Sequence, residues 1–226
     1  GAHELFEGVY WIARYRQPDL DKEQLNQQIE DIKLDLWIEL NNDLTPLEKI
    51  KKVNHIFYNV YHFRGDVEDY HSPENSFLQE VVTNRKGNPI SLSILYAILC
   101  QRVGIAVYGV NLPQHYVLSF KDHDTFPDET STKGYHYLEP TQEGKTLFYI
   151  NSFNKGTVFS QWNIDQFLKQ LNIDPSSTYY EPCSNMATIM RVCRNLIYAY
   201  ENIGEPENSN DIGSLLATLE AYDPGW

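Results

Sequence analysis

The sequence predicts an α+β protein in which helices pack on a small antiparallel sheet. Apolar residues recur at helical spacing as far as Gly104, and again from Ser160 onward. Between these two parts the chain is rich in β-branched and aromatic residues, which favour extended strands. The turn residues QEG lie between the last two predicted strands and act as a hairpin turn, so neighbouring strands are expected to run antiparallel.

Three helices are expected before residue 61. The first, "ELFEGVYWIARY", ends near Pro18, and Asp21 can cap the second. The apolar face of the second helix consists of Leu25, Ile29, Ile32 and Leu36. Thr45 is a good N-cap for the third helix and Pro46 suits its first position. The predicted apolar face of this third helix consists of Leu47, Ile50, Val53, Phe57 and Val60.

The helix of residues 89–103 has the clearest boundaries. It follows a loop, predicted for residues 64–75 from their Gly, Pro, Asp and Asn content, and a short helix at 76–85. Asn88 can accept a hydrogen bond from the first-turn amides, Pro89 supplies a suitable φ, and Gly104 can end the helix in the left-handed conformation.

Four strands and three further helices complete the expected order of elements. The strands are "IAVYGVNL", "HYVLSF", "GYHYLEPT" and "LFYINSF", with "KDHDTFPDETSTKG" as an exposed connection. The helices are "SQWNIDQFLKQL", "MATIMRVCRNLIYAYENI" and "DIGSLLATLEAY". We therefore expect a core at residues 1–175, including the N-terminal helices, and a helical hairpin at 176–226 packed on that core.

Composition excludes several classes of partner. The 226 residues are enough for one substantial core. The net charge of −13 repels phosphate backbones and anionic lipid surfaces, and no apolar run reaches the length of about 18 residues that a membrane span needs. We therefore expect neither a nucleic-acid nor a membrane partner. Three cysteines without a CxxC pair predict no disulfide framework, which favours a cytoplasmic location.

The start of the helix at 89–103 is the first place to look for a nucleophile. A helix N-terminus carries unpaired amides and a partial positive charge, so a cysteine there ionises easily. The residues at this point are instead Pro89, Ile90 and Ser91. Cys100 lies about nine residues further on, roughly 14 Å along the helix, and is expected to belong to the core.

Four polar residues are candidates for a catalytic or relic site. Ser91 is either a nucleophile activated by a base or an ordinary capping residue. His115, where a turn enters a strand, is either a general base or a histidine satisfied by a backbone carbonyl. Glu139 and Asn151 on the following strands are alternative partners that could orient its ring.

The histidine spacing does not favour a metal centre. His55, His62 and His71 are spaced too widely for a compact ligand set, and the chain contains neither HExxH nor a P-loop. We therefore expect no metal and no nucleotide cofactor.

Two stretches resemble a known family. "RKGNPISLSILY" and "GVNLPQHYVL" are similar to motifs of the SirB-type, invasion-gene-regulator-like bacterial proteins, which have a transglutaminase-like core. The resemblance runs from about Leu5 to the end of the chain. It implies a papain/transglutaminase-like fold and a C-terminal extension similar to tetratricopeptide helices, whose first pair corresponds to the predicted hairpin.

The resemblance also implies where catalytic groups of active enzymes would fall. The cysteine position falls at Pro89 to Ser91, the histidine position at His115 and the acidic position at Asn151. Asn can orient an imidazole but cannot stabilise an imidazolium by charge. Gln114 stands where the family usually has glycine.

These observations leave three functional hypotheses. The main one is a non-catalytic transglutaminase-like binding or regulatory module, a pseudoenzyme without the nucleophilic cysteine. The alternative is a serine-dependent hydrolase or acyltransferase that uses Ser91 and His115 with Asn151 or Glu139. The third is recognition of a protein or peptide in a cleft between helix and sheet, lined by tyrosines such as Tyr116. The sequence predicts no oligomeric state.

Overall fold

The protein is described by a computed structural model that covers residues 1–122, 142 and 144–222. The α-helices of these residues are α1 (Ala2–Arg16), α2 (Lys22–Glu39), α3 (Pro46–Asn54), α4 (Leu78–Asn84), α5 (Pro89–Arg102), α6 (Gln161–Gln170), α7 (Asn185–Ile203) and α8 (Pro206–Tyr222). The strands are β1 (Arg64–Gly65), β2 (Lys86–Gly87), β3 (Val107–Leu112), β4 (His115–Lys121), β5 (Thr146–Asn151) and β6 (Thr157–Phe159). The predicted α+β class is confirmed.

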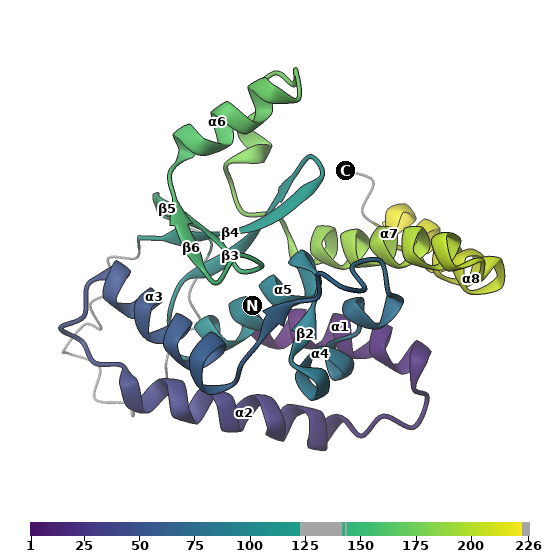
Figure 1. Cartoon of the computed structure of the whole chain (residues 1–226), viewed down its shortest axis with the longest axis horizontal. Helices are drawn as coiled ribbons and strands as arrows, with labels where there is room; N and C mark the ends of the chain where they lie inside the picture. Colours follow the sequence, from purple (N-terminus) through teal and green to yellow (C-terminus); the bar gives the residue numbers. More distant parts are fainter. Residues whose placement is uncertain (123–141, 143, 223–226) are drawn as a thin grey trace.

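The main sheet separates a large core from a small one. Strands β3, β4, β5 and β6 pair in this order and antiparallel throughout. Helix α5 packs against one face of the sheet, with α1, α2 and α4 beyond it, whereas α6 covers the other face (Figure 1). The main cluster joins α5 to Leu118 and Ile150 of the sheet, and the second cluster joins Val117 to Ile164 and Leu168 of α6.

Helix α5 is the centre of the fold. All its residues from Ile90 to Gln101 are buried, because other elements surround the helix on every side. Both predicted helix ends are confirmed. The Asn88 side chain accepts a hydrogen bond from the Ser91 amide at 3.0 Å, and Gly104 follows the helix with a φ of +79°.

The helix predicted from Thr45 is correct at its start and partly wrong at its end. Thr45 and Glu48 form the capping box, and Ile50 and Val53 are buried. After Asn54 the chain continues as a π-helix, His55–Val60. This turn holds more residues than an α-turn, so later side chains leave the predicted face. Phe57 is buried, but Val60 is 45% exposed. Leu47, in the first turn of α3, is 50% exposed.

Three of the predicted strands correspond to β3, β4 and β5. The predicted strand "GYHYLEPT" and nearly all of the connection "KDHDTFPDETSTKG" lie outside the described residues. Strand β6 was not predicted, because its three residues are too few to show a period. The predicted loop at 64–75 contains β1, which pairs in parallel with β2.

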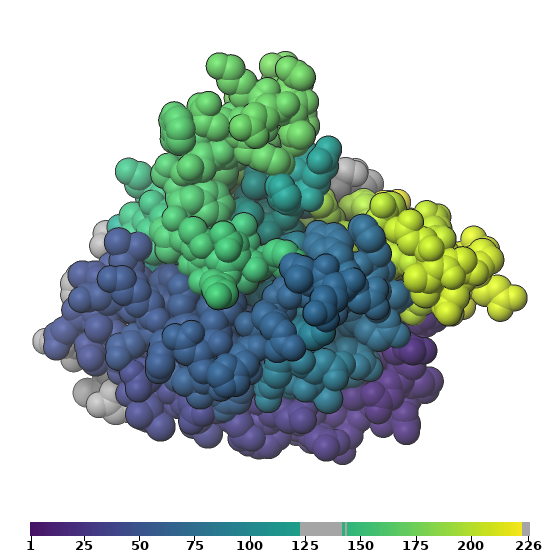
Figure 2. Space-filling view, in the orientation of Figure 1, coloured from purple at the N-terminus to yellow at the C-terminus, as the bar shows by residue number. Residues whose placement is uncertain are grey.

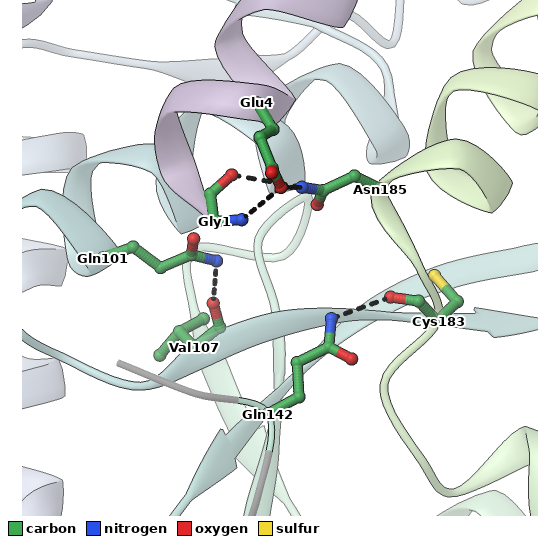
Figure 3. A network of polar contacts seen from close by, with 7 residues as sticks. All are labelled: Gly1, Glu4, Gln101, Val107, Gln142, Cys183 and Asn185. Atoms are coloured by element: carbon green, nitrogen blue, oxygen red, sulfur yellow. Dashed lines mark hydrogen bonds and ion pairs between the residues drawn. The ribbon is translucent and has the colours of Figure 1, made fainter. Parts of the chain in front are cut away.

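The C-terminal helices α7 and α8 pack against each other and project from one side of the molecule (Figure 2). Gly204, at φ +76°, ends α7. Residues Ile189, Val192 and Leu196 of α7 belong to the main core. The Asn185 side chain donates hydrogen bonds to the Gly1 carbonyl oxygen and to Glu4, which ties α7 to the start of α1 (Figure 3). Helix α7 therefore packs against the main core and α1.

Candidate ligand-binding cleft at the start of helix α5

The Ser91 hydroxyl is held inside the cap of α5. Its Oγ donates to the Asn75 carbonyl oxygen at 2.6 Å and accepts from the Asn88 amide at 3.1 Å. The Asn88 side chain in turn donates to the Ser76 hydroxyl at 2.8 Å. Ser91 is 3% exposed. The sequence left Ser91 as either a nucleophile or a capping residue, and these hydrogen bonds are those of a capping residue.

His115 faces α6, on the side of the sheet away from α5. It pairs with Leu112, whose side chain belongs to the second cluster, and residues directly opposite each other in an antiparallel pair share a face of the sheet. Val117, two residues further along β4, belongs to the same cluster. The imidazole lies against the Phe167 ring, with 4.8 Å between ring centroids. Burial, and then the charge of Arg191, lower the pKa of His115 below its ordinary value. Both effects favour the neutral form of the ring.

Asn151 also lies away from α5. Ile150 points into the main core, so Asn151 alternates to the opposite face, and its Oδ1 accepts a hydrogen bond from the Asn154 amide at 3.1 Å. Glu139 lies outside the described residues. The structure thus places His115 and Asn151 on one face of the sheet and Ser91 on the helix that packs against the other. It does not bring Ser91 and His115 together.

The three thiols are buried in different places. Cys100 is in the middle of α5, and burial raises its pKa well above the ordinary value. The Cys183 Sγ lies 3.4 Å from the Thr188 hydroxyl and 3.8 Å from the Tyr116 hydroxyl. Burial raises the pKa of Cys193, on α7, to about 11. Each thiol is therefore protonated at neutral pH.

A cleft of about 200 Å³ lies beside the first turn of α5. Four segments contribute to it: the loop before α4, the start of α5, the turn between β3 and β4, and α7. Figure 2 shows the blue loop, the teal turn and the yellow-green hairpin next to one another on this face. The lining residues are Tyr70, His71, Ser72, Ser76, Asn88, Pro89, Ile90, Gln114, Tyr116, Arg191, Asn195, Tyr198 and Ala199.

Arg191 lines this cleft and carries a permanent positive charge. Its Nη1 donates to the Asn111 Oδ1 at 2.9 Å and to the Leu112 carbonyl oxygen at 3.4 Å. Within the part of the chain that the structure describes, no carboxylate pairs with it, whereas Arg194 pairs with Glu220 at 2.7 Å. Burial, and then the charge of Arg194, lower the pKa of Arg191, yet a guanidinium stays charged at neutral pH.

Strand β4 and its turn contribute an aromatic wall and an amide. The Tyr116 hydroxyl lies 2.7 Å from that of Thr188, and the ring crosses the backbone of Gly109, where a Cβ would fall 1.8 Å from the hydroxyl oxygen. Gln114 has a φ of +60°, a conformation in which glycine would be unstrained. Its side chain borders the cleft, which lies on the same side of the sheet as Tyr116 and α5.

Sequence reasoning singled out Tyr116 but missed the contribution of α7. Arg191, Asn195 and Tyr198 lie one helical turn apart, so they share one side of that helix. The feature of the sequence that could have indicated this contribution is Arg191, a charged residue between the apolar Met190 and Val192, which are both buried. That signal does not reveal which other segment the residue faces.

The described residues contain neither a metal-binding cluster nor a membrane-spanning helix. No group of three His, Cys, Asp or Glu side chains there is arranged to hold a metal ion. No helix of these residues combines the length and apolarity that a membrane crossing requires.

A buried helix packed on an antiparallel sheet, with a polar cleft at the start of the helix, is consistent with the transglutaminase-like class. The family model described as the transglutaminase-like superfamily matches residues 23–194. The chain belongs to this superfamily.

The chain is also similar to curated proteins. It is 33% identical to a UPF0162 protein of Xylella fastidiosa over 211 residues, which are 88% of this chain and 65% of that protein. It is 24% identical to a UPF0162 protein of Vibrio cholerae over 167 residues, 74% of this chain and 54% of that protein. The chain thus spans less than two thirds of the length of these relatives.

A shorter similarity reaches a eukaryotic protein. The chain is 35% identical to the mouse F-box only protein 21 over 66 residues, which are 29% of this chain and 10% of that protein. No solved structure matches the chain.

Proposed function

We propose that this protein is a non-catalytic binding or regulatory module with a transglutaminase-like core that lacks the nucleophilic cysteine. The observation that carries the proposal is the arrangement at the start of α5. The one hydroxyl there, on Ser91, is used in the cap and is 3% exposed. A nucleophile needs both access to substrate and a base, whereas this hydroxyl is enclosed and its hydrogen-bond partners are backbone groups of Asn75 and Asn88.

The positions of the thiols and of the imidazole support the same conclusion. The thiolate is the reactive form of cysteine, and burial disfavours it at Cys100, Cys183 and Cys193. The imidazole of His115 lies against Phe167. A site without its nucleophile keeps only a small part of the rate enhancement of an intact one.

Enzyme assays of the purified chain test this proposal directly. We expect no ammonia release from a glutamine-containing peptide and no incorporation of a dansylated amine into casein above the buffer blank, with an active transglutaminase as positive control. Mass spectrometry of the reaction mixture would reveal a covalent acyl adduct. An adduct or a steady release of ammonia would overturn the proposal.

The serine-dependent alternative is tested with a fluorophosphonate probe. We expect the parent chain and Ser91→Ala to label equally and at background, because the hydroxyl is enclosed by the cap. Labelling of the parent that disappears in Ser91→Ala and in His115→Ala, but not in the exposed Ser214→Ala, would favour the hydrolase instead.

We infer further details from the motifs alone. "RKGNPISLSILY" and "GVNLPQHYVL" support a SirB-type protein, and the hairpin α7–α8 then corresponds to the first pair of a tetratricopeptide-like extension. A protein or peptide partner, a division of the chain at residue 175 and a cytoplasmic location belong to the same proposal.

A further inference from the structure

We propose that the cleft at the start of α5 binds a carboxylate-bearing ligand of single-residue size, such as the last residue of a peptide chain. This inference rests on the proposed binding function and specifies the ligand class for it. Its basis is the cleft together with the guanidinium that lines it.

Arg191 is a charged group whose position needs an explanation. The protein carries 31 acidic against 18 basic side chains, yet no carboxylate of its described residues pairs with this guanidinium. Half-burying a charge without an opposite charge costs free energy. Asn111 and the Leu112 carbonyl hold Nη1 in place, which orients the side chain without neutralising it. A bound carboxylate would supply the missing charge, in the geometry that a guanidinium recognises best.

Neutral donors surround the same space. The Asn195 and Gln114 side-chain amides line the cleft, and so does Ile90. Pro89 has no amide hydrogen and the Ser91 amide is used by Asn88, so the Ile90 amide is the remaining first-turn donor at the positive end of α5. These groups can complete the hydrogen bonds of one carboxylate beside Arg191.

The size and walls of the cleft limit what the carboxylate is attached to. A volume of about 200 Å³ is below the roughly 300–1,000 Å³ of pockets for drug-sized ligands, so a group of about one residue fits. Tyr70, Tyr116 and Tyr198 provide flat walls that suit an apolar or aromatic side chain. The net charge of −13 disfavours ligands with several negative charges, such as phosphorylated ones.

Gln114 allows stability and binding to be separated. A non-glycine residue at φ +60° is strained, so Gln114→Gly should make the fold more stable. If the side-chain amide serves the ligand, the same variant should bind more weakly. A residue with a purely structural role would not show these opposite changes.

The test is a titration of the uniformly ¹⁵N-labelled chain with N-acetylphenylalanine and, separately, with N-acetylphenylalaninamide. We expect the acid to shift the amide signals of Ile90 and Asn195 and to bind at least tenfold more tightly than the amide. Equal affinities would overturn the proposal, as would shifts outside the cleft only.

Two further peptides distinguish the source of the carboxylate. One is Gly-Gly-Gly-Phe with a free C-terminus, and the other is an acetylated, amidated peptide with an internal Glu. Tighter binding of the first would assign the site to a chain terminus, and tighter binding of the second to an acidic side chain. Binding of neither peptide, when the free acid binds, would exclude a peptide and restrict the ligand to a small acid.

Matched variants identify the charge that binds. Arg191→Gln should lose at least tenfold in affinity for the acid, whereas Arg194→Gln, three residues away and paired with Glu220, should change it less than twofold. If Arg191→Gln fails to fold, Asn195→Ala and the exposed Tyr198→Ala are tested instead and should each lose at least threefold in affinity. Equal affinities in all variants would overturn the proposal. Enzymatic activity of the chain would overturn the proposed function without affecting these binding results.

Discussion

The Ser91 hydroxyl donates a 2.6 Å hydrogen bond to the carbonyl oxygen of Asn75, sixteen residues earlier in the chain. The bond joins the first turn of α5 to the segment that precedes α4. Because the same oxygen also accepts from the Asn88 amide, one hydroxyl satisfies two buried backbone groups. The residue most suited by position to act as a nucleophile is thus part of the framework of the cleft.

Removing this hydroxyl is expected to destabilise the fold. Ser91→Ala removes both hydrogen bonds of this hydroxyl, although the Asn88 amide still donates to the Asn75 carbonyl oxygen at 3.3 Å, so we expect a loss of about 1 kcal/mol in the free energy of unfolding. Urea denaturation measures it. The control is Ser214→Ala, an exposed helical serine, for which we expect a change within about 0.5 kcal/mol. Equal effects of the two variants would contradict this role of Ser91.

Gly109 is expected to tolerate no side chain. Its Cβ would fall 1.8 Å from the Tyr116 hydroxyl oxygen and 2.5 Å from the ring carbon that carries it. The Thr188 hydroxyl and the core hold this ring, so we expect Gly109→Ala to cost about 1–3 kcal/mol.

The matched control for Gly109 is Gly213, in the interior of α8, where an added Cβ meets nothing within 4 Å. Alanine is a better helix former than glycine, so Gly213→Ala should gain up to about 1 kcal/mol. Thermal unfolding compares the two variants. Changes of the same sign would show that Tyr116 moves easily, contrary to the packing described.

The pH dependence of stability should report the position of His115. Burial and then Arg191 lower its pKa in the folded protein below the unfolded value of about 6.5. Below pH 6.5 the unfolded chain therefore binds more protons at this residue, and stability falls as the pH falls towards the folded pKa. Above pH 6.5 this contribution does not change.

The measurement for His115 is the difference between the parent and His115→Gln in the free energy of unfolding, from pH 5 to 8. We expect the variant to have a flatter slope below pH 6.5 and the same slope above it. NMR titration of the imidazole gives the folded pKa directly. A value above 6.5 would instead place a carboxylate beside the ring.

The three thiols should react slowly in the native protein. Cys100, Cys183 and Cys193 are buried and their pKa values are raised, in the case of Cys193 to about 11. At pH 8 we expect Ellman's reagent to modify all three in guanidinium chloride and none within minutes in buffer. Rapid native labelling of one cysteine, identified by mass spectrometry, would show an accessible thiolate and weaken the proposal of a non-catalytic protein.

Local features of the fold were predicted well because each depends on residues a few positions apart. The caps at Asp21, Thr45 and Asn88 are of this kind, as is the left-handed Gly104 after α5. The π-helix after Asn54 was missed because the periodic pattern continues through it.

The sequence by itself determined the class of the fold, the central helix with its ends, and the absence of cysteine from the start of that helix. Only the tertiary structure decided which groups meet there. Sheet register turns His115 towards α6, and the docking of α7 brings Arg191 to the start of α5. Contacts between segments about 50 to 100 residues apart depend on how the whole core packs, so the local spacing of residues does not predict them.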